Sequence, residues 1–164
     1  DGAHIINDIS AGEKDLKMFE TIINLDVPYI MMHMQGDSKN MQVNPKYEDV
    51  NSDIISFFEQ KVKYLNTKGF KKIIIDPGFG FGKTIEHNYE ILKNLKRFKE
   101  LNLPILAGLS RKSMIYNLLE TSAEKALNGT SIANTISLFN GAKILRVHDV
   151  KQAVECIRIY NMIK

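Results

Sequence analysis

Residues 72–84 read Lys-Ile-Ile-Ile-Asp-Pro-Gly-Phe-Gly-Phe-Gly-Lys-Thr. The apolar run over residues 72–75 has the length of a strand and lacks the alternation of a half-exposed one, which is typical of a parallel strand buried on both faces. The run ends at Asp76, and the Pro and Gly residues that follow predict a loop. The stretch therefore predicts one strand of a parallel sheet, with a carboxylate at its carboxyl end.

The same pattern recurs along the whole chain. Apolar runs of strand length occupy residues 4–6, 29–32, 72–75, 104–107 and 143–145. Apolar positions spaced by three or four predict helices over residues 16–23, 50–65, 91–98, 123–139 and 153–160. Gly69 and Gly141 stand where helices should stop, and the longest predicted loop spans residues 34–48. This order predicts an α/β fold of five βα units, with residues 1–164 as one domain.

The composition excludes several classes of protein. The chain has 164 residues, 44% of them hydrophobic, which suits a globular domain and excludes low-complexity disorder. The single cysteine, Cys156, excludes a disulfide scaffold and is best interpreted as a small core residue. A net charge of +3 is too small to indicate a nucleic-acid partner, and no apolar run is long enough to span a membrane. Because the first residue is Asp1 rather than Met, we expect the chain to be part of a longer protein.

Each predicted strand is followed by polar side chains. In parallel α/β folds the active site lies at the carboxyl ends of the strands. The cationic groups among these residues suit a phosphate or diphosphate, and the amide and carboxylate suit the donor and acceptor edge of a heterocycle. The residues concerned are Asn7-Asp8, His33-Met34-Gln35, Asp76, Ser110-Arg111-Lys112 and Arg146-Val147-His148-Asp149.

Most of these residues also have a structural interpretation. Asp76 alone is equally consistent with capping a turn, and a lone His33 is more often a buried histidine than a ligand. Arg111 and Lys112 could form a solvated start of a helix. His4 and His87 are interpreted as structural, and no spacing of residues indicates a metal site or a nucleophile.

The glycine-rich loop does not match the common nucleotide-binding patterns. A phosphate-binding loop needs a glycine five residues before Gly82, where this sequence has Pro77. Glycines that alternate with phenylalanines indicate a backbone that passes close to a flat ligand, with Phe79 or Phe81 packed on it.

Taken together, these motifs resemble the dihydropteroate synthase family. The matching segments are residues 7–9, 32–36, 75–84, 109–113 and 146–150, in the order found in that family. The resemblance covers the whole chain and implies a (β/α)8 barrel. It also implies condensation of a dihydropterin-methyl diphosphate with 4-aminobenzoate, in a pathway of folate biosynthesis that sulfonamides inhibit.

The resemblance implies a role for each candidate residue. Asn7 and Asp76 would bind the polar edge of the pterin, and Lys112 would contact its other side. Met34 and Gly108 would pack against the pterin, while Phe81 and Ser110 would line the 4-aminobenzoate pocket. Arg146 and His148 would hold the diphosphate. Lys112, Arg146 and His148 would be the catalytic groups, because loss of diphosphate needs orientation and anion stabilisation rather than a nucleophile.

The resemblance also implies what this chain lacks. The family's first three strands have no counterpart here, so the expected fold is a partial barrel that is inactive alone. The family's magnesium-linked asparagine belongs to that absent part, which leaves Mg²⁺ as an expected cofactor without a ligand in this chain. A cytoplasmic homodimer is expected. The alternatives are a pterin-binding methyltransferase domain, which has no diphosphate to bind, and a non-catalytic pterin-binding module.

Overall fold

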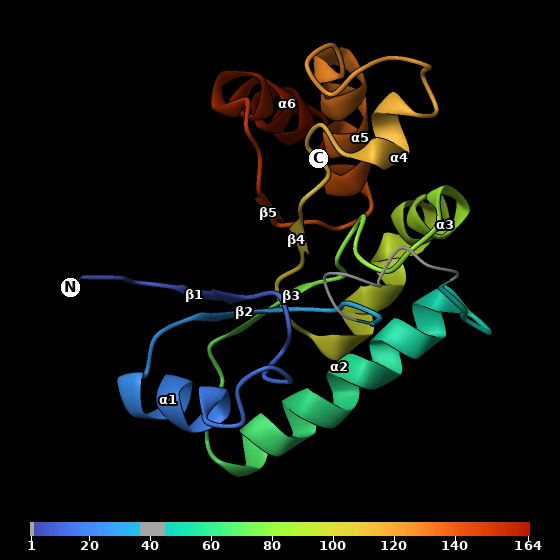
Figure 1. Ribbon diagram of the computed structural model, residues 1–164. Helices are drawn as coiled ribbons and strands as arrows, with labels where there is room; N and C mark the ends of the chain where they lie inside the picture. The colour runs from blue at the N-terminus through green and yellow to red at the C-terminus, as the bar shows by residue number, and fades with distance from the viewer. Residues whose placement is uncertain (1, 37–44) are drawn as a thin grey trace.

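A computed structural model describes residues 2–36 and 45–164, in which strands and helices alternate along the chain (Figure 1). The elements are β1 (Ile6–Asp8), α1 (Met18–Leu25), β2 (Tyr29–Met32), α2 (Val50–Thr67), β3 (Ile73–Asp76), α3 (Ile85–Asn94), the 3₁₀ helix η1 (Leu95–Leu101), β4 (Leu106–Ala107), α4 (Ser113–Tyr116), α5 (Leu127–Phe139), β5 (Ile144–Leu145) and α6 (Val150–Ile163). The predicted α/β class is confirmed.

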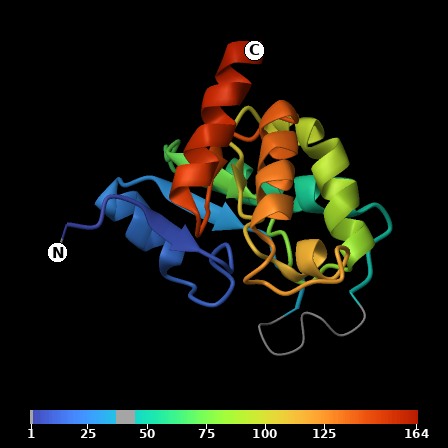
Figure 2. The ribbon, with the colours of Figure 1, turned by 90° about the horizontal axis from the view of Figure 1, so that it is seen from above.

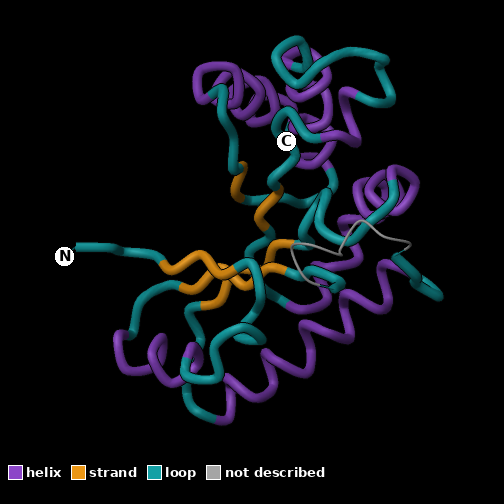
Figure 3. The backbone as a smooth tube through the Cα atoms, in the orientation of Figure 1, coloured by secondary structure: helices purple, strands orange, loops and turns teal. Residues whose placement is uncertain are grey.

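The strands are parallel and lie in sequence order. One sheet has the order β1-β2-β3 and a second pairs β4 with β5, while a parallel bridge between Ile75 and Ile105 joins the two. The strands follow one another through the middle of the molecule, and the helices lie outside them (Figure 3). Because the strands run in one direction, their carboxyl ends gather on one side, as expected for a parallel α/β protein.

Several predicted boundaries are corrected by the structure. β1 begins at Ile6 and includes Asn7 and Asp8, because pairing with β2 starts at Ile6 and leaves His4 outside the strand. The single helix expected over residues 91–98 is divided at Asn94, whose side chain donates to the Glu90 carbonyl at 3.0 Å and competes with the helical pattern. The short helix α4 was not predicted, because a single turn shows no periodicity.

Local signals in the sequence explain the ends of the longer helices. Asp49 caps α2 by accepting from the Ser52 amide at 2.8 Å, and Thr84 and His87 form a reciprocal capping box at the start of α3. Gly69 and Gly141 follow α2 and α5 with positive φ, which confirms the predicted stops. Of the predicted loop 34–48, residues 37–44 lie outside the described residues. None of the described helices is both long and apolar enough to cross a membrane.

The glycine-rich loop packs directly on the residues that follow β2. A Cβ atom on Gly78, whose φ is +73°, would lie 1.9 Å from the His33 carbonyl oxygen. We therefore expect Gly78→Ala to lower the free energy of unfolding by about 3 kcal/mol or more, since the backbone at His33, directly after β2, would have to move. Gly69→Ala is the matched control, because Gly69 has a φ of +78° but open space around it. Its expected cost is about 1 kcal/mol. Equal costs in urea denaturation would contradict this packing.

Candidate functional site at the carboxyl ends of the strands

Asp76 occupies the centre of the site, at the end of β3, and its side chain is 1% exposed. Its Oδ1 accepts from the Gly78 amide at 2.8 Å. Its Oδ2 lies 2.8 Å from Arg146 Nη2, at ion-pair distance but without the direction of a hydrogen bond. Within the described residues, Oδ2 therefore keeps an unused acceptor position, which a ligand N–H group can fill.

Arg146 connects three strand ends. Its Nη2 faces Asp76 at the end of β3, and its Nη1 donates to Asn7 Oδ1 in β1 at 2.9 Å, although Arg146 itself follows β5. Gly108 leaves room for this arrangement, because a Cβ there would lie 2.8 Å from Arg146 Nη2. The predicted residues Asn7, Asp76, Gly108 and Arg146 are thus brought together.

A small cationic cavity adjoins this contact. It has a volume of about 190 Å³ and is lined by Gly108, Ser110, Lys112, Arg146, Val147 and His148. Ser110 is buried, and its hydroxyl lies 2.9 Å from His148 Nδ1 while accepting from the His148 amide at 3.2 Å. Two cationic side chains beside a hydroxyl and an imidazole suit an anionic group such as a diphosphate.

Lys112 joins the cavity to the glycine-rich loop. Its Nζ donates to the Phe79 carbonyl and lies 4.5 Å from the centre of the Phe81 ring. Burial lowers the pKa of Lys112 to about 8, while the Asp76 carboxylate acts in the opposite direction and Arg146 lowers it further. The Lys112 side chain therefore loses its positive charge just above neutral pH.

Arg111, considered above as a further cation of the site, is used within the protein. Its Nε and Nη2 bind both oxygens of Asp149 at 2.8 and 2.9 Å, and its Nη1 donates to the carbonyls of Ala123 and Glu124. The Arg111 guanidinium holds the pKa of Asp149 below its usual value. The pair ties the loop after β4 to the loop after β5, so it supports Lys112 and His148 rather than adding a ligand-binding charge.

Of the remaining predicted residues, some are buried in the core and others can reach a ligand. Phe79 is fully buried and belongs to the core, so of the two phenylalanines only Phe81, which is half-buried, is placed to meet a ligand. Met34 is buried after β2 and does not line the cationic cavity. Cys156 is buried in α6, as expected.

Lys83 is not among the residues predicted for the site. Lys83 is 3% exposed, and its Nζ lies 3.0 Å from Nδ1 of His33, the histidine interpreted above as buried. The sequence signal that could have indicated it is the Gly82-Lys83-Thr84 ending of the glycine-rich loop, which otherwise resembles the end of a phosphate-binding loop.

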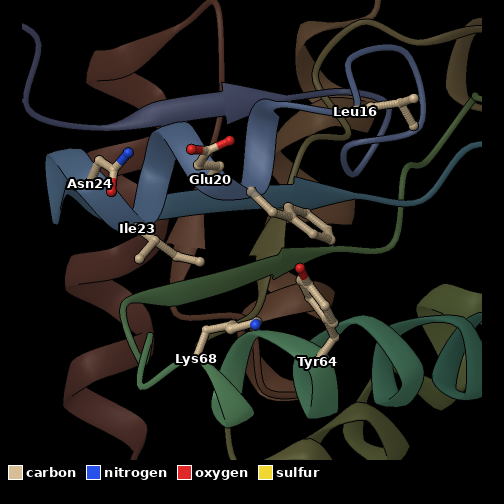
Figure 4. Close-up of a pocket in the computed structure, with 7 residues that line it drawn as sticks. Leu16, Glu20, Ile23, Asn24, Tyr64 and Lys68 are labelled. Atoms are coloured by element: carbon tan, nitrogen blue, oxygen red, sulfur yellow. The ribbon is translucent and has the colours of Figure 1, made fainter.

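Another hollow lies away from these residues, between α1 and the end of α2 (Figure 4). Its volume is about 560 Å³, and its lining residues are Leu16, Phe19, Glu20, Ile23, Asn24, Tyr64 and Lys68. None of the residues predicted for the site lines it. The described residues also contain no group of three His, Cys, Asp or Glu side chains that could hold a metal ion.

The fold and site define a parallel α/β protein that places a buried carboxylate beside a cavity lined by Lys112 and Arg146. The chain matches the family model of pterin binding enzymes over residues 1–148. It therefore belongs to the pterin binding enzyme family.

Individual relatives agree with this assignment. The chain is 42% identical to the dihydropteroate synthase of Escherichia coli, over 96% of this chain and 56% of that protein. It is 41% identical to the dihydropteroate synthase of Haemophilus influenzae, over 98% of this chain and 58% of that protein. The chain thus spans a little over half the length of these curated relatives.

Solved structures show the same similarity. The Yersinia pestis dihydropteroate synthase, in a sulfonamide drug complex, has a TM-score of 0.94 and 40% identity, covering 98% of this chain and 59% of that one. The Xanthomonas albilineans enzyme, in complex with 7,8-dihydropteroate, has a TM-score of 0.90 and 34% identity, covering 99% of this chain and 60% of that one.

Because the Lys112 ammonium loses its proton near pH 8, binding of inorganic diphosphate should weaken as the pH rises from 7 to 9. Titration calorimetry across this range measures the effect. Lys112→Met should remove this step in affinity, whereas Lys96→Met, at an exposed position, should keep it. An unchanged step in Lys112→Met would show that another group is responsible.

Proposed function

We propose that this chain carries the pterin and diphosphate sites of a dihydropteroate synthase. The reaction condenses (7,8-dihydropterin-6-yl)methyl diphosphate with 4-aminobenzoate and gives 7,8-dihydropteroate and diphosphate. The observation that carries the proposal is the buried Asp76 carboxylate, with one oxygen not hydrogen-bonded among the described residues, next to the cavity of Lys112, Arg146 and His148. The relatives named dihydropteroate synthase, and the one solved with dihydropteroate, support it.

In this proposal the pterin replaces a contact within the protein. Arg146 now directs its planar guanidinium at Asp76 and Asn7. The 2-amino-pyrimidinone edge of a pterin presents a similar planar set of N–H groups, so it can bind the same two acceptors. Arg146 is then released to the diphosphate in the neighbouring cavity, and Lys112 lies between the two parts of the ligand.

The chemistry requires a leaving group to be stabilised. The bond between the pterin methylene carbon and the diphosphate oxygen breaks, and the bond pair leaves with the diphosphate. The aromatic amine of 4-aminobenzoate then forms the new C–N bond and loses a proton. Lys112, Arg146 and His148 hold the departing anion, and Phe81 and Ser110 line the side from which the amine approaches. Met34 and Gly108 pack against the pterin. Preorganised positive charge at a developing anion lowers the barrier directly.

Magnesium is part of the proposal through the family resemblance alone. Magnesium sites in proteins use one or two carboxylates together with phosphate oxygens. The cavity is lined by cations, and the described residues contain no cluster of metal-binding side chains, so they do not fit a magnesium site by themselves. We propose that magnesium enters as a complex with the diphosphate.

The five βα units are proposed to form one arc of the eight-unit barrel expected from the resemblance, with residues 1–164 as one pterin-binding domain of a cytoplasmic protein. The strand order β1 to β5 and the helices outside the strands support this arrangement. Within the described residues β1 and β5 each pair on one side only. A closed barrel has no such edges.

We further propose that the protein is a homodimer that associates through α5 and α6. These helices lie side by side (Figure 2), and their outer faces expose the apolar residues Ile132, Ile136, Phe139, Val154 and Ile159. An apolar hollow of about 420 Å³ lies in the same face. Exposed apolar side chains gathered at an apolar hollow, as Ile132, Ile136 and Ile159 are here, are typical of protein interfaces.

The alternatives make different predictions for ligand binding. A pterin-binding methyltransferase would retain the Asp76 contact but would have no use for the cationic cavity after β4 and β5. A non-catalytic module would bind pterin without forming product. The cavity favours the synthase, because it lies next to Asp76 and has no other assigned ligand.

Product formation and ligand binding test the proposal in the protein as its gene encodes it. We expect dihydropteroate to form from both substrates with magnesium, and we expect residues 1–164 alone to form little or none.

Asp76→Ala should abolish pterin binding in calorimetry. Arg146→Ala should weaken the pterin diphosphate by about tenfold or more, since a charged hydrogen-bond partner is lost, and it should not weaken the diphosphate-free pterin, which displaces Arg146 from Asp76. Undiminished pterin affinity in Asp76→Ala would contradict the proposal that Asp76 binds the pterin.

The dimer is tested by the oligomeric state. Ile136→Glu places a charge in the proposed interface, so we expect sedimentation velocity to show a monomer where the unmodified protein is a dimer. Leu16→Glu is the control, because Leu16 is 96% exposed and lies far from α5 and α6 in the sequence. A monomeric unmodified protein, or a dimeric Ile136→Glu variant, would contradict the proposal.

A further inference from the structure

Lys83 is a buried charged residue that the proposed reaction does not use. Its Nζ contacts His33 Nδ1 at 3.0 Å, donates to the Phe81 carbonyl at 2.9 Å and lies 3.5 Å from the His33 carbonyl. An ammonium group has three N–H donors, and these three acceptors match them in number. A lysine that is only 3% exposed is expensive to bury unless its head group makes such contacts.

Burial and neighbouring charges determine which group donates in the contact between Lys83 and His33. Burial, together with the charges of Lys83 and Lys61, lowers the pKa of His33 to about 2, so the imidazole is neutral and its Nδ1 can accept from Lys83. Burial lowers the pKa of Lys83 to about 7, Asp76 opposes this effect, and Lys112 adds to it. Lys83 thus donates to His33 and to the glycine-rich loop at once.

The contact lies where two loops meet. Gly78 and Gly82 press their backbones against His33 and Gln35, with no room for a Cβ atom. The Tyr47 hydroxyl donates to the Gly82 carbonyl at 2.7 Å from the other end of the loop after β2. The buried Lys83 side chain connects the two loops, because its Nζ contacts His33 Nδ1 and donates to the Phe81 carbonyl.

Phe81 is held from its two ends. Lys83 binds its carbonyl, and Lys112 Nζ lies 4.5 Å from the centre of its ring. Movement of the loop would shift the Phe81 ring relative to Lys112. Asp76 and Arg146 have contacts of their own with Gly78 and Asn7, so the pterin edge does not depend directly on the Phe81 carbonyl.

We propose that Lys83 is a positioning residue for the amine substrate, which keeps the Phe81 ring beside Lys112 by holding the Phe81 carbonyl against the end of β2. The inference rests on the proposed function, because it takes Phe81 as part of the 4-aminobenzoate pocket. The buried Lys83 is thus expected to affect the binding of 4-aminobenzoate and not that of the pterin diphosphate.

The test compares two substrates in the protein as its gene encodes it. Lys83→Met retains the apolar stem and removes the donors. We expect the KM for 4-aminobenzoate to rise about tenfold or more, as for the loss of a charged hydrogen bond. The Kd of the pterin diphosphate in calorimetry should stay within about twofold, the effect of a change outside the contact. Lys93→Met is the control on α3, where the Lys93 side chain is 76% exposed, and it should change neither value.

A purely structural role would give a different result. Loss of active protein would lower kcat and leave the KM for 4-aminobenzoate and the Kd of the pterin diphosphate unchanged. That result would overturn the inference. An equal weakening of both substrates would overturn it as well. Absence of turnover in the unmodified protein would instead overturn the proposed function, and this inference with it, so the two failures are distinguishable.

A second variant tests the same contact in case Lys83→Met does not fold. His33→Phe keeps an aromatic ring packed against Phe57, whose ring centre lies 4.9 Å from that of His33, and removes the Nδ1 acceptor. We expect a smaller rise in the KM for 4-aminobenzoate, in the same direction. In a Phe81→Ala background the His33→Phe change should have no further effect on that KM, because the positioned ring is absent. An unchanged KM in His33→Phe, or an equal effect in both backgrounds, would overturn the inference.

Discussion

The contact between buried Asp76 and Arg146 is the interaction on which the site depends. A carboxylate that is almost entirely removed from water is costly unless it is paired. Asp76 obtains one partner from its own loop, the Gly78 amide, and the other from Arg146 after β5. Arg146 also reaches Asn7 in β1. One guanidinium therefore ties together strand ends that are distant in the sequence, and it does so at the acceptors that the proposed pterin needs.

Around this contact, loops of two kinds shape the site. The glycine-rich loop approaches the end of β2 through backbone alone, so its geometry depends on the absence of Cβ atoms at Gly78 and Gly82. The loops after β4 and β5 are joined instead by the bidentate pair of Arg111 and Asp149. Close packing makes the first junction rigid, and a two-point ionic contact orients the second. The residues that line the cationic cavity come from the loops after β4 and β5.

Much of this arrangement can be predicted from local patterns. The bounds of β2 match the apolar run 29–32, and the stops at Gly69 and Gly141 agree with their positive φ. Asp76 and Arg146 were identified because polar residues follow each strand, and the parallel order implied that they would meet. The prediction was wrong where a competing contact decides, as at Asn94, whose side chain bonds to the preceding turn and ends the α-helix.

Arg111 and Lys112 show what the sequence determined and what it left to the tertiary structure. The sequence determined that two cations follow the fourth strand, at the edge where a site should lie. The structure decided that Arg111, with a φ of +54°, turns to Asp149, while Lys112 lies in the cavity beside Asp76. Neighbouring residues look alike to a local pattern, since periodicity reports only on contacts within one element. The partner of Arg111 lies 38 residues away, and only the folded chain brings it within reach.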